Sequence, residues 1–322
     1  MTKKPTLLIT RDMPPLVAAR AVENYDARLN PDDKVYTPDA LIAAAEGVDG
    51  MLIAGTEKMT REAFGRLPES VKIVACFTAG FDHVDLDAAK ARGVVVTHAP
   101  DALTDAVADI SLLLLLGAAR RAGEGEALMR SGGWDNIHLL FMTGTEIKGK
   151  RLGILGMGRI GRAVAARARA FGLEIHYHNR SRLAPELEAG AVWHDTAESL
   201  LECSDFLSLH CPSNEESRNF LDANAIARLP EGATVINTAR GDVVDDEALI
   251  AALESGRVGA AGLDVYRGEP NNIHPGYARL KNTFLLPHIG SATVETRSGM
   301  GLHALDNLDA FFAGKEPPNR LV

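Results

Sequence analysis

Leu152-Gly153-Ile154-Leu155-Gly156-Met157-Gly158-Arg159-Ile160-Gly161 is the stretch that decides the fold of this chain. Its first four residues form a short apolar run typical of a buried β-strand, and Ile160–Phe171 then follows the apolar spacing of a helix. The three glycines allow a tight turn, the approach of a pyrophosphate to backbone N–H groups, and close packing of helix on strand. In this context Gly156–Gly161 predicts a dinucleotide-binding turn, with a merely glycine-rich turn as the alternative.

The same alternation of strand and helix patterns runs along nearly the whole chain. Strands are predicted where short runs are rich in β-branched residues or leucine, at Leu7–Thr10, Met51–Ala54, Ile73–Phe77, Val94–Thr97, Glu174–His178 and Val235–Asn237. Further helices are predicted at Asp39–Ala45, Leu86–Ala91 and Asp246–Leu253, each with a glycine shortly after its end. Alternation of this kind is typical of βαβ units, so we expect a doubly wound α/β fold with parallel sheets.

The length of 322 residues exceeds one ordinary core and suits two domains. The segment Ala99–Thr104 contains a proline and precedes a long apolar helical pattern at Ala106–Arg120. A second candidate crossing is His288–Thr293, before a final helix predicted from about Val294 to Ala313. We expect the chain to pass between its domains at these two places.

Charge and cysteine content exclude several classes of protein. The net charge of -9 argues against a nucleic-acid or anionic-membrane surface, so an anionic ligand must be held by a few local arginines or lysines. The three cysteines contain no CxxC pair and predict neither a disulfide framework nor a metal site such as zinc. The longest apolar stretch, Ile110–Ala119, is about half of what a membrane span needs. We expect a cytoplasmic protein.

The residues after the strand at Glu174–His178 bear on cofactor choice. An NAD-binding site places an acid about 20 residues after the glycine turn, to bind the ribose. This chain has Asn179 there, followed by Arg180, Ser181 and Arg182. Arginine binds a 2′-phosphate that an acid would repel, so we expect NADP(H) to be preferred, with NAD(H) still possible. The alternative is that both arginines are solvated loop residues.

Three later stretches follow predicted strands: Asn237–Gly241, Asp264–Pro270 and Pro287–Thr293. Ligands collect at strand ends in open α/β sheets. Reduction of a keto acid needs a cation for the carboxylate, an acid to protonate the carbonyl oxygen, and a partner that tunes this acid. Arg240, His288 and Glu269 supply one of each, and a carboxylate beside a histidine favours the imidazolium.

The order of these motifs resembles that of the D-2-hydroxyacid dehydrogenases, and the resemblance covers nearly the full chain. It rests on the glycine turn, Asn237-Thr238-Ala239-Arg240-Gly241, Asp264-Val265-Tyr266 with Glu269-Pro270 after it, and Pro287-His288-Ile289-Gly290-Ser291-Ala292-Thr293. The loop Ala79–Asp85 is similar to the substrate-domain loop of that family. The Trp134 region with Gly144–Gly153 resembles its glyoxylate and hydroxypyruvate reductase branch.

The resemblance implies roles for individual residues. Arg240 would orient the carboxylate and keto oxygen of the substrate, His288 would be the acid/base, and Glu269 would pair with the imidazole. Backbone N–H groups at Ala54-Gly55-Thr56 and Ala79-Gly80 would hold the substrate carboxylate. Besides Gly156–Gly161 and Asn179–Arg182, the implied cofactor contacts are Cys211, Pro212, Thr238, Ala239, Asp264 and Gly290. Cys211 itself we interpret as a packing residue.

The resemblance also implies a domain arrangement and an oligomer. A Rossmann NAD(P)-binding domain at 102–289 would be inserted into a flavodoxin-like substrate domain built from 1–101 and 290–322. Relatives dimerise through the cofactor domain, so we expect a homodimer, with the apolar segment Ile110–Ala118 and the polar arm to Trp134 as the candidate surface.

Three other functions use the same fold. Phosphite-oxidising relatives place a lysine before the loop glycine, where this chain has Ala79. The longer 3-phosphoglycerate dehydrogenases carry a regulatory domain for which 322 residues leave no room. A nucleotide-sensing corepressor would share the motifs, but the stretch from Trp134 to Gly144 and the lack of a disordered tail favour an enzyme. Reduction of a small 2-keto acid such as glyoxylate or hydroxypyruvate is therefore the leading prediction.

Overall fold

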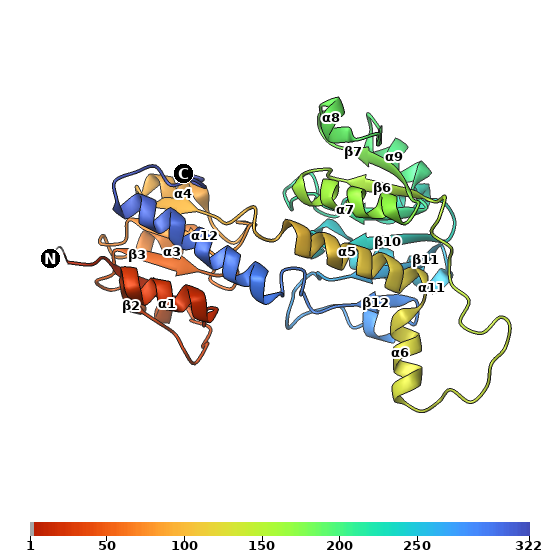
Figure 1. The fold of residues 1–322 in the computed structure, drawn as a ribbon, viewed down its shortest axis with the longest axis horizontal. Helices are drawn as coiled ribbons and strands as arrows, with labels where there is room; N and C mark the ends of the chain where they lie inside the picture. Colours follow the sequence, from red (N-terminus) through yellow and green to blue (C-terminus); the bar gives the residue numbers. More distant parts are fainter. Residues whose placement is uncertain (1–2) are drawn as a thin grey trace. The chain divides into compact units, whose positions relative to one another are not determined.

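The computed structural model of the chain describes residues 3–322 and contains two compact units. The first unit runs to Leu103 and resumes at Ser291, and the second spans Thr104–Gly290. These crossings lie close to the expected ones, at residues 101/102 and 289/290. Each unit has its own parallel sheet and its own buried apolar clusters, as a doubly wound α/β domain requires (Figure 1).

The first unit holds a five-stranded parallel sheet in the order β2-β1-β3-β4-β5, which is the flavodoxin-like order. Its strands are β1 (Thr6–Ile9), β2 (Asp26–Arg28), β3 (Gly50–Ile53), β4 (Ile73–Cys76) and β5 (Val95–Thr97). Its helices are α1 (Pro15–Asn24), α2 (Pro38–Ala44), α3 (Arg61–Arg66), α4 (Leu86–Ala91) and α12 (Val294–Phe312). Helices α2, α3 and α4 bury one face of the sheet, and α1 and α12 bury the other.

Helix α12 belongs to this unit although most of the chain separates it from α1. The two helices lie side by side (Figure 1), and Arg20 of α1 pairs with Asp306 of α12 at 2.7 Å. Leu305 and Leu308 are fully buried against the sheet. The end of the chain therefore completes the domain that its beginning starts.

The second unit holds a seven-stranded parallel sheet in the order β12-β11-β10-β9-β6-β7-β8. Its strands are β6 (Arg151–Leu155), β7 (Glu174–His178), β8 (Val192–Trp193), β9 (Phe206–Leu209), β10 (Ala233–Asn237), β11 (Val258–Leu263) and β12 (Thr283–Leu285). Its helices are α5 (Thr104–Ala119), α6 (Ala122–Arg130), α7 (Arg159–Ala170), α8 (Pro185–Glu188), α9 (Ala197–Cys203), α10 (Ala223–Arg228) and α11 (Asp246–Ser255). The order reverses between β6 and β9, which is the switch point where Rossmann folds bind dinucleotides.

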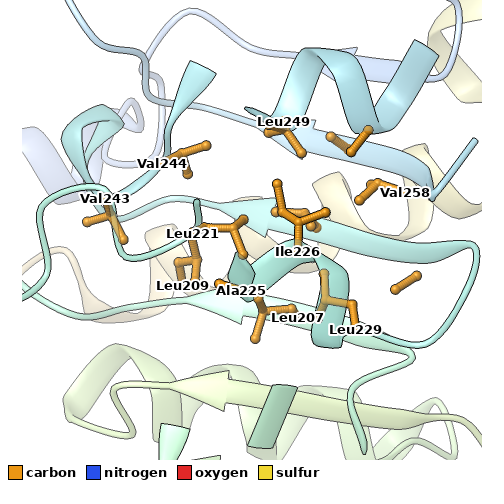
Figure 2. Close-up of a cluster of buried hydrophobic side chains, with 14 of the residues drawn as sticks. Leu207, Leu209, Leu221, Ala225, Ile226, Leu229, Val243, Val244, Leu249 and Val258 are labelled. Atoms are coloured by element: carbon orange, nitrogen blue, oxygen red, sulfur yellow. The ribbon is translucent and has the colours of Figure 1, made fainter. Parts of the chain in front are cut away.

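Apolar clusters cover both faces of this sheet. Helices α5 and α7 pack on one face, and α9, α10 and α11 pack on the other. Figure 2 shows the cluster on the face that α9, α10 and α11 cover. There Leu207 of β9, Ile226 of α10 and Leu249 of α11 lie together and are almost completely buried. Burial of this kind contributes roughly 1.5–3 kcal/mol per large side chain and fixes the strands whose ends form the site.

Helix α5 confirms the predicted buried helix. Leu114 and Leu115 are fully buried in the core of their own unit, and Gly117 faces Phe284 so closely that a Cβ would lie 2.3 Å from the ring. Leu113 is the large side chain of this segment that is well exposed, at 45%. Most of Ile110–Ala118 thus packs in the core of its own unit, and its part in a dimer surface stays a prediction. Among residues 3–322, no helix has the length and apolar character needed to cross a membrane.

Candidate active site

The three predicted catalytic residues follow three adjacent parallel strands. Because β10, β11 and β12 are neighbours, the loops that follow them leave from the same edge of the sheet. Arg240 follows β10, Glu269 lies in the loop after β11, and His288 lies three residues after β12. The sheet therefore brings together residues that are 48 positions apart in the sequence, from 240 to 288.

His288 and Glu269 form a direct pair. Nδ1 of His288 lies 2.5 Å from Oε1 of Glu269, and Oε2 of Glu269 accepts a hydrogen bond of 2.9 Å from the backbone N–H of Tyr266. The carboxylate is thus held from both sides. The imidazole remains 52% exposed, so its other nitrogen, Nε2, can meet a substrate. His288 has a φ of 54°, a left-handed conformation that non-glycine residues adopt at a cost and that often marks functional positions.

The pair changes the pKa of both partners. The hydrogen bond from His288 to Glu269 and the charge of Glu269 raise the pKa of the histidine above its ordinary value of 6.5, although burial opposes this. Burial acts to raise the pKa of Glu269, but the hydrogen bond and charge of His288 outweigh it and the pKa is lowered. The imidazolium–carboxylate form is therefore favoured, and His288 is set to donate a proton from Nε2.

Asp264 fixes the loop that carries His288. Its carboxylate is almost completely buried, and its two oxygens accept hydrogen bonds of 2.8 Å each from the backbone N–H groups of Ile289 and Gly290. Desolvation raises the pKa of Asp264 while these hydrogen bonds lower it, and the net shift is upward. Asp264 and Gly290 thus have an observed positioning role, and their contact with a nicotinamide stays a prediction.

Arg240 acts electrostatically on both members of the pair, lowering the pKa of each. Its position depends on Asn237, which is buried and caps the turn. The Asn237 amide donates to the carbonyl of Arg240 at 2.9 Å and accepts from the N–H of Ala239 at 3.0 Å. Gly241 is required next, since a Cβ there would lie 2.0 Å from the backbone of Tyr266. Arg240 is half-buried, and its Nη1 donates a hydrogen bond of 2.7 Å to the carbonyl of Ala239.

The glycine turn after β6 has the geometry that a pyrophosphate needs. Gly156 has a φ of 95°, and a Cβ there would lie 2.8 Å from the backbone of His210 and Cys211. Gly161 packs α7 on the strand, with a would-be Cβ 2.5 Å from the carbonyl of Gly156. At Gly158 a Cβ would meet nothing within 4 Å, and this N-cap residue leaves the N-terminus of α7 without a side-chain cap. The residues present fit a dinucleotide.

The four residues after β7 differ in their contacts. Asn179 Oδ1 accepts a hydrogen bond of 2.6 Å from the N–H of Met157, so this side chain braces the glycine turn. Arg182 pairs with Glu188 at 2.7 Å and lies over the ring of Trp193, 5.5 Å from its centroid. Arg180 and Ser181 are exposed. The sequence pattern gave no reason to prefer Arg180 or Arg182. Because Arg182 is paired with Glu188, Arg180 is the better candidate for binding a 2′-phosphate.

The remaining predicted cofactor residues follow β9 and β10, and Cys211 borders the glycine turn at Gly156. Thr238 Oγ1 lies 2.9 Å from Ser111 Oγ, and Ala239 is buried. Burial raises the pKa of the Cys211 thiol to about 11, in accord with a packing role, and Cys211 precedes the exposed Pro212. Cys211, Thr238 and Gly156 follow β9, β10 and β6, which are neighbours on the switch-point side of the sheet.

The predicted substrate loops lie in the first unit. The N–H of Ala54 donates to Glu57 Oε2 at 2.8 Å, so this amide is already occupied and we withdraw it as a substrate ligand. Glu57, which is buried, also accepts from Thr10 at 2.8 Å. A lone glutamate in a loop gives no signal in the sequence, so this contact could not be predicted. Gly55, Ala79 and Gly80 stay predicted substrate contacts.

The fold and the site define a nicotinamide-dependent oxidoreductase of the Rossmann type, and comparison with known proteins agrees. Residues 112–290 match the family described as D-isomer specific 2-hydroxyacid dehydrogenase, NAD binding domain. That is more than half of the chain. The chain therefore belongs to the D-isomer specific 2-hydroxyacid dehydrogenase family, whose members use NAD(P).

Individual relatives match over nearly the full length. The chain is 47% identical to a glycerate dehydrogenase from Hyphomicrobium methylovorum, with 98% of each chain covered. It is 41% identical to a glyoxylate reductase from Thermococcus litoralis, over 98% of this chain and 96% of the relative. A solved structure of an NADPH-dependent glyoxylate/hydroxypyruvate reductase from Sinorhizobium meliloti, in complex with NADP and malonate, is 32% identical with a TM-score of 0.89, over 99% and 97%.

Proposed function

We propose that this protein reduces a small 2-keto acid to a D-2-hydroxy acid, using NADPH. The observation that carries the proposal is the His288–Glu269 pair at 2.5 Å, with Arg240 close enough to act on the pKa of both. A cation, an acid and a carboxylate that keeps the acid charged are the groups that carbonyl reduction needs. All three follow adjacent strands of the dinucleotide-binding sheet.

Each residue has one task in this proposal. Bound NADPH supplies the hydride. Arg240 binds the substrate carboxylate, because a planar guanidinium can donate two parallel hydrogen bonds to a carboxylate. It thereby also orients the keto oxygen next to that carboxylate. His288 donates a proton from Nε2 to that oxygen, and Glu269 stabilises the imidazolium before the transfer. Asp264 keeps His288 in place through the backbone of the next two residues.

Hydroxypyruvate and glyoxylate are the proposed substrates. The relative from Hyphomicrobium methylovorum is named for glycerate, and reduction of the keto group of hydroxypyruvate gives glycerate. Relatives from Thermococcus litoralis and Sinorhizobium meliloti are named for glyoxylate. Both acids carry a carboxylate next to the carbonyl that is reduced, so both need one carboxylate-binding cation and one proton donor.

We further propose that NADPH is preferred over NADH. Arg180 is exposed directly after the residue that braces the glycine turn, and no acid stands at position 179 to repel a 2′-phosphate. The NADP complex of the Sinorhizobium meliloti relative supports this choice. Arg182 supports it less, because its guanidinium is bound to Glu188.

A homodimer formed through the cofactor unit is the proposed oligomer. Between α6 and β6 the chain forms a long arm in which Ile137, Leu139 and Leu140 are 75%, 99% and 83% exposed. Apolar side chains exposed together to this extent mark a contact surface. The candidate interface is therefore this arm together with the exposed Leu113 of the segment Ile110–Ala118. A cytoplasmic location stays a prediction from the cysteine pattern.

A panel of keto acids tests the proposed function. Purified protein is mixed with NADPH or NADH and with glyoxylate, hydroxypyruvate, pyruvate or phenylpyruvate, and the loss of reduced-nicotinamide absorbance is followed. We expect the fastest oxidation with NADPH and glyoxylate or hydroxypyruvate. Oxidation of neither cofactor with any of the four acids would overturn the proposal.

A further inference from the structure

Two histidines and a cysteine meet at the edge of the seven-stranded sheet, in a place that the proposed reaction does not use. His176 is the middle residue of β7, His194 directly follows β8, and Cys203 ends α9. One ligand atom from each side chain lies within 4.8 Å of the other two. All three residues are half-buried, and no ion pair engages their side chains among the interactions of the described residues. The geometry points to a binding site for one Zn²⁺ ion, formed by His176 Nδ1, His194 Nε2 and Cys203 Sγ.

The distances suit a tetrahedral metal. His176 Nδ1 lies 2.9 Å from His194 Nε2, and Cys203 Sγ lies 3.5 Å from the same nitrogen. With zinc bonds of about 2.0–2.1 Å to nitrogen and 2.3 Å to sulfur, neighbouring ligand atoms lie about 3.3–3.6 Å apart. The nitrogens must therefore separate by about 0.4 Å to admit the ion, and His176 Nδ1 and Cys203 Sγ, which lie within 4.8 Å of each other, must come to the same range. Side-chain rotations of this size need no change in the backbone.

The backbone around the three residues is fixed. The N–H of His194 donates to the carbonyl of Tyr177 at 2.8 Å, which continues the pairing of β7 with β8. The end of α9 is closed by Ser204 Oγ, which donates to the carbonyl of Leu200 at 2.6 Å. It packs on β6 so closely that only a glycine fits opposite Ser204 at position 153. The ligands thus come from three elements that are already in place. Preorganisation of this kind lowers the cost of binding.

A hydrogen bond to a serine orients one of the ligands. His194 Nδ1 lies 2.7 Å from Ser199 Oγ. If Nδ1 carries the proton and donates it to this hydroxyl, Nε2 is left with the lone pair that a metal requires, and metal-binding histidines commonly have such a partner. Cys203 now contacts the carbonyl of Leu200 at 3.3 Å as a thiol. On metal binding it becomes a thiolate, and its proton leaves to solvent.

The ligand chemistry selects the ion. Imidazole and thiolate groups favour zinc over magnesium or calcium, which require oxygen ligands. Three protein ligands leave the fourth position for water. The ion would connect β7, the residue after β8 and α9, where the two-residue strand β8 forms the edge of the sheet. We therefore assign it a role in holding this edge. This departs from the expectation of no metal site, which considered cysteine spacing alone.

Cobalt provides a spectroscopic test on the full-length chain after treatment with a chelator. Titration with Co²⁺ is expected to give a saturable thiolate-to-cobalt band at one ion per chain, which Zn²⁺ then removes by displacement. Cys203→Ser should abolish the band, whereas Cys211→Ser, the matched control for a half-buried thiol outside the cluster, should retain it. Ser199→Ala should weaken binding by about tenfold or more.

Stability gives an independent readout. Zn²⁺ should raise the melting temperature of the wild-type chain and of Cys211→Ser, but not that of His176→Gln or Cys203→Ser. Circular dichroism of each variant without metal checks that it folds. Absence of saturable binding to the wild type, a band that survives Cys203→Ser, or equal stabilisation of the wild type and His176→Gln would overturn the proposal.

Discussion

The second unit contains two histidine sites with opposite electrostatic environments, the His288–Glu269 pair and the His176–His194 pair. The hydrogen bond to a carboxylate raises the pKa of His288. His176 faces His194 at 2.9 Å, and there desolvation and, secondarily, the second imidazole lower the pKa of His176. Desolvation also lowers the pKa of His194. The same side chain is therefore prepared to donate a proton in one place and to offer a lone pair in the other.

The difference shows what a histidine alone does not reveal. Both pairs belong to the seven-stranded parallel sheet or to the loops that follow its strands, and both contain a contact of 2.9 Å or less. The partner decides the charge state of the imidazole, and with it the chemistry. Experiments that change one partner at a time test whether the partner decides the chemistry of the imidazole.

Removal of the proton donor is expected to have the largest effect. His288→Ala should lower kcat for keto acid reduction by about 10²–10⁴-fold, since general acid catalysis contributes about this much. Binding of NADPH, measured by fluorescence titration, should persist. His274→Ala is the matched control, because His274 also contacts a glutamate, Glu247, at 3.0 Å but lies outside the site. Equal kcat values for the two variants would remove His288 from the mechanism.

Loss of the loop anchor should have the next largest effect. In Asp264→Asn one carboxylate oxygen is replaced by an NH2 group. The backbone N–H of Ile289 or of Gly290 then faces this nitrogen, which cannot accept a hydrogen bond. A buried donor left without an acceptor costs about 1–3 kcal/mol, and we expect a loss of this size in the free energy of unfolding together with a lower kcat. Urea denaturation and steady-state rates measure both. Asp109→Asn, at a carboxylate whose side chain is 67% exposed, is the control; a similar loss there would contradict the anchoring role.

Cofactor choice should respond to one arginine more than to the other. Arg180→Ala should weaken NADPH binding by about tenfold or more and NADH binding much less, because a charge-assisted hydrogen bond contributes about 1.5–3 kcal/mol. Arg182→Ala removes the contacts with Glu188 and Trp193, so it should lower the melting temperature and change the NADPH/NADH ratio less. Equal losses for both cofactors in Arg180→Ala would show that this residue does not bind the 2′-phosphate.

The sequence predicted the fold where apolar runs were long and missed elements that depend on their neighbours. Strands β6 and β7 and helices α5 and α7 were expected within a few residues of their observed ends. The edge strands β2 and β8, with three and two residues, are partly exposed and too short to give a recognisable pattern. Such strands exist because a neighbouring strand pairs with them, and this is not visible in a local pattern.

The residues of the candidate site were predicted, but the hydrogen bonds that hold them in place were not. Arg240, Glu269 and His288 were expected together, and the adjacent strands bring them together. The buried acids Asp264 and Glu57 act through backbone amides, and nothing in the sequence distinguishes such an acid from a surface one. His176, His194 and Cys203 are separated by 18 and 9 residues, a spacing that matches no common metal motif.

The pH dependence of kcat/KM for keto acid reduction tests most directly whether Glu269 sets the charge of His288. Reduction needs the imidazolium, so the rate falls as the pH rises through the pKa of His288, which lies above 6.5 in the wild type. In Glu269→Gln the charge that raises this pKa is lost, and the fall should move to lower pH, while Glu247→Gln should leave it in place. A fall at the same pH in the wild type and Glu269→Gln would contradict the account.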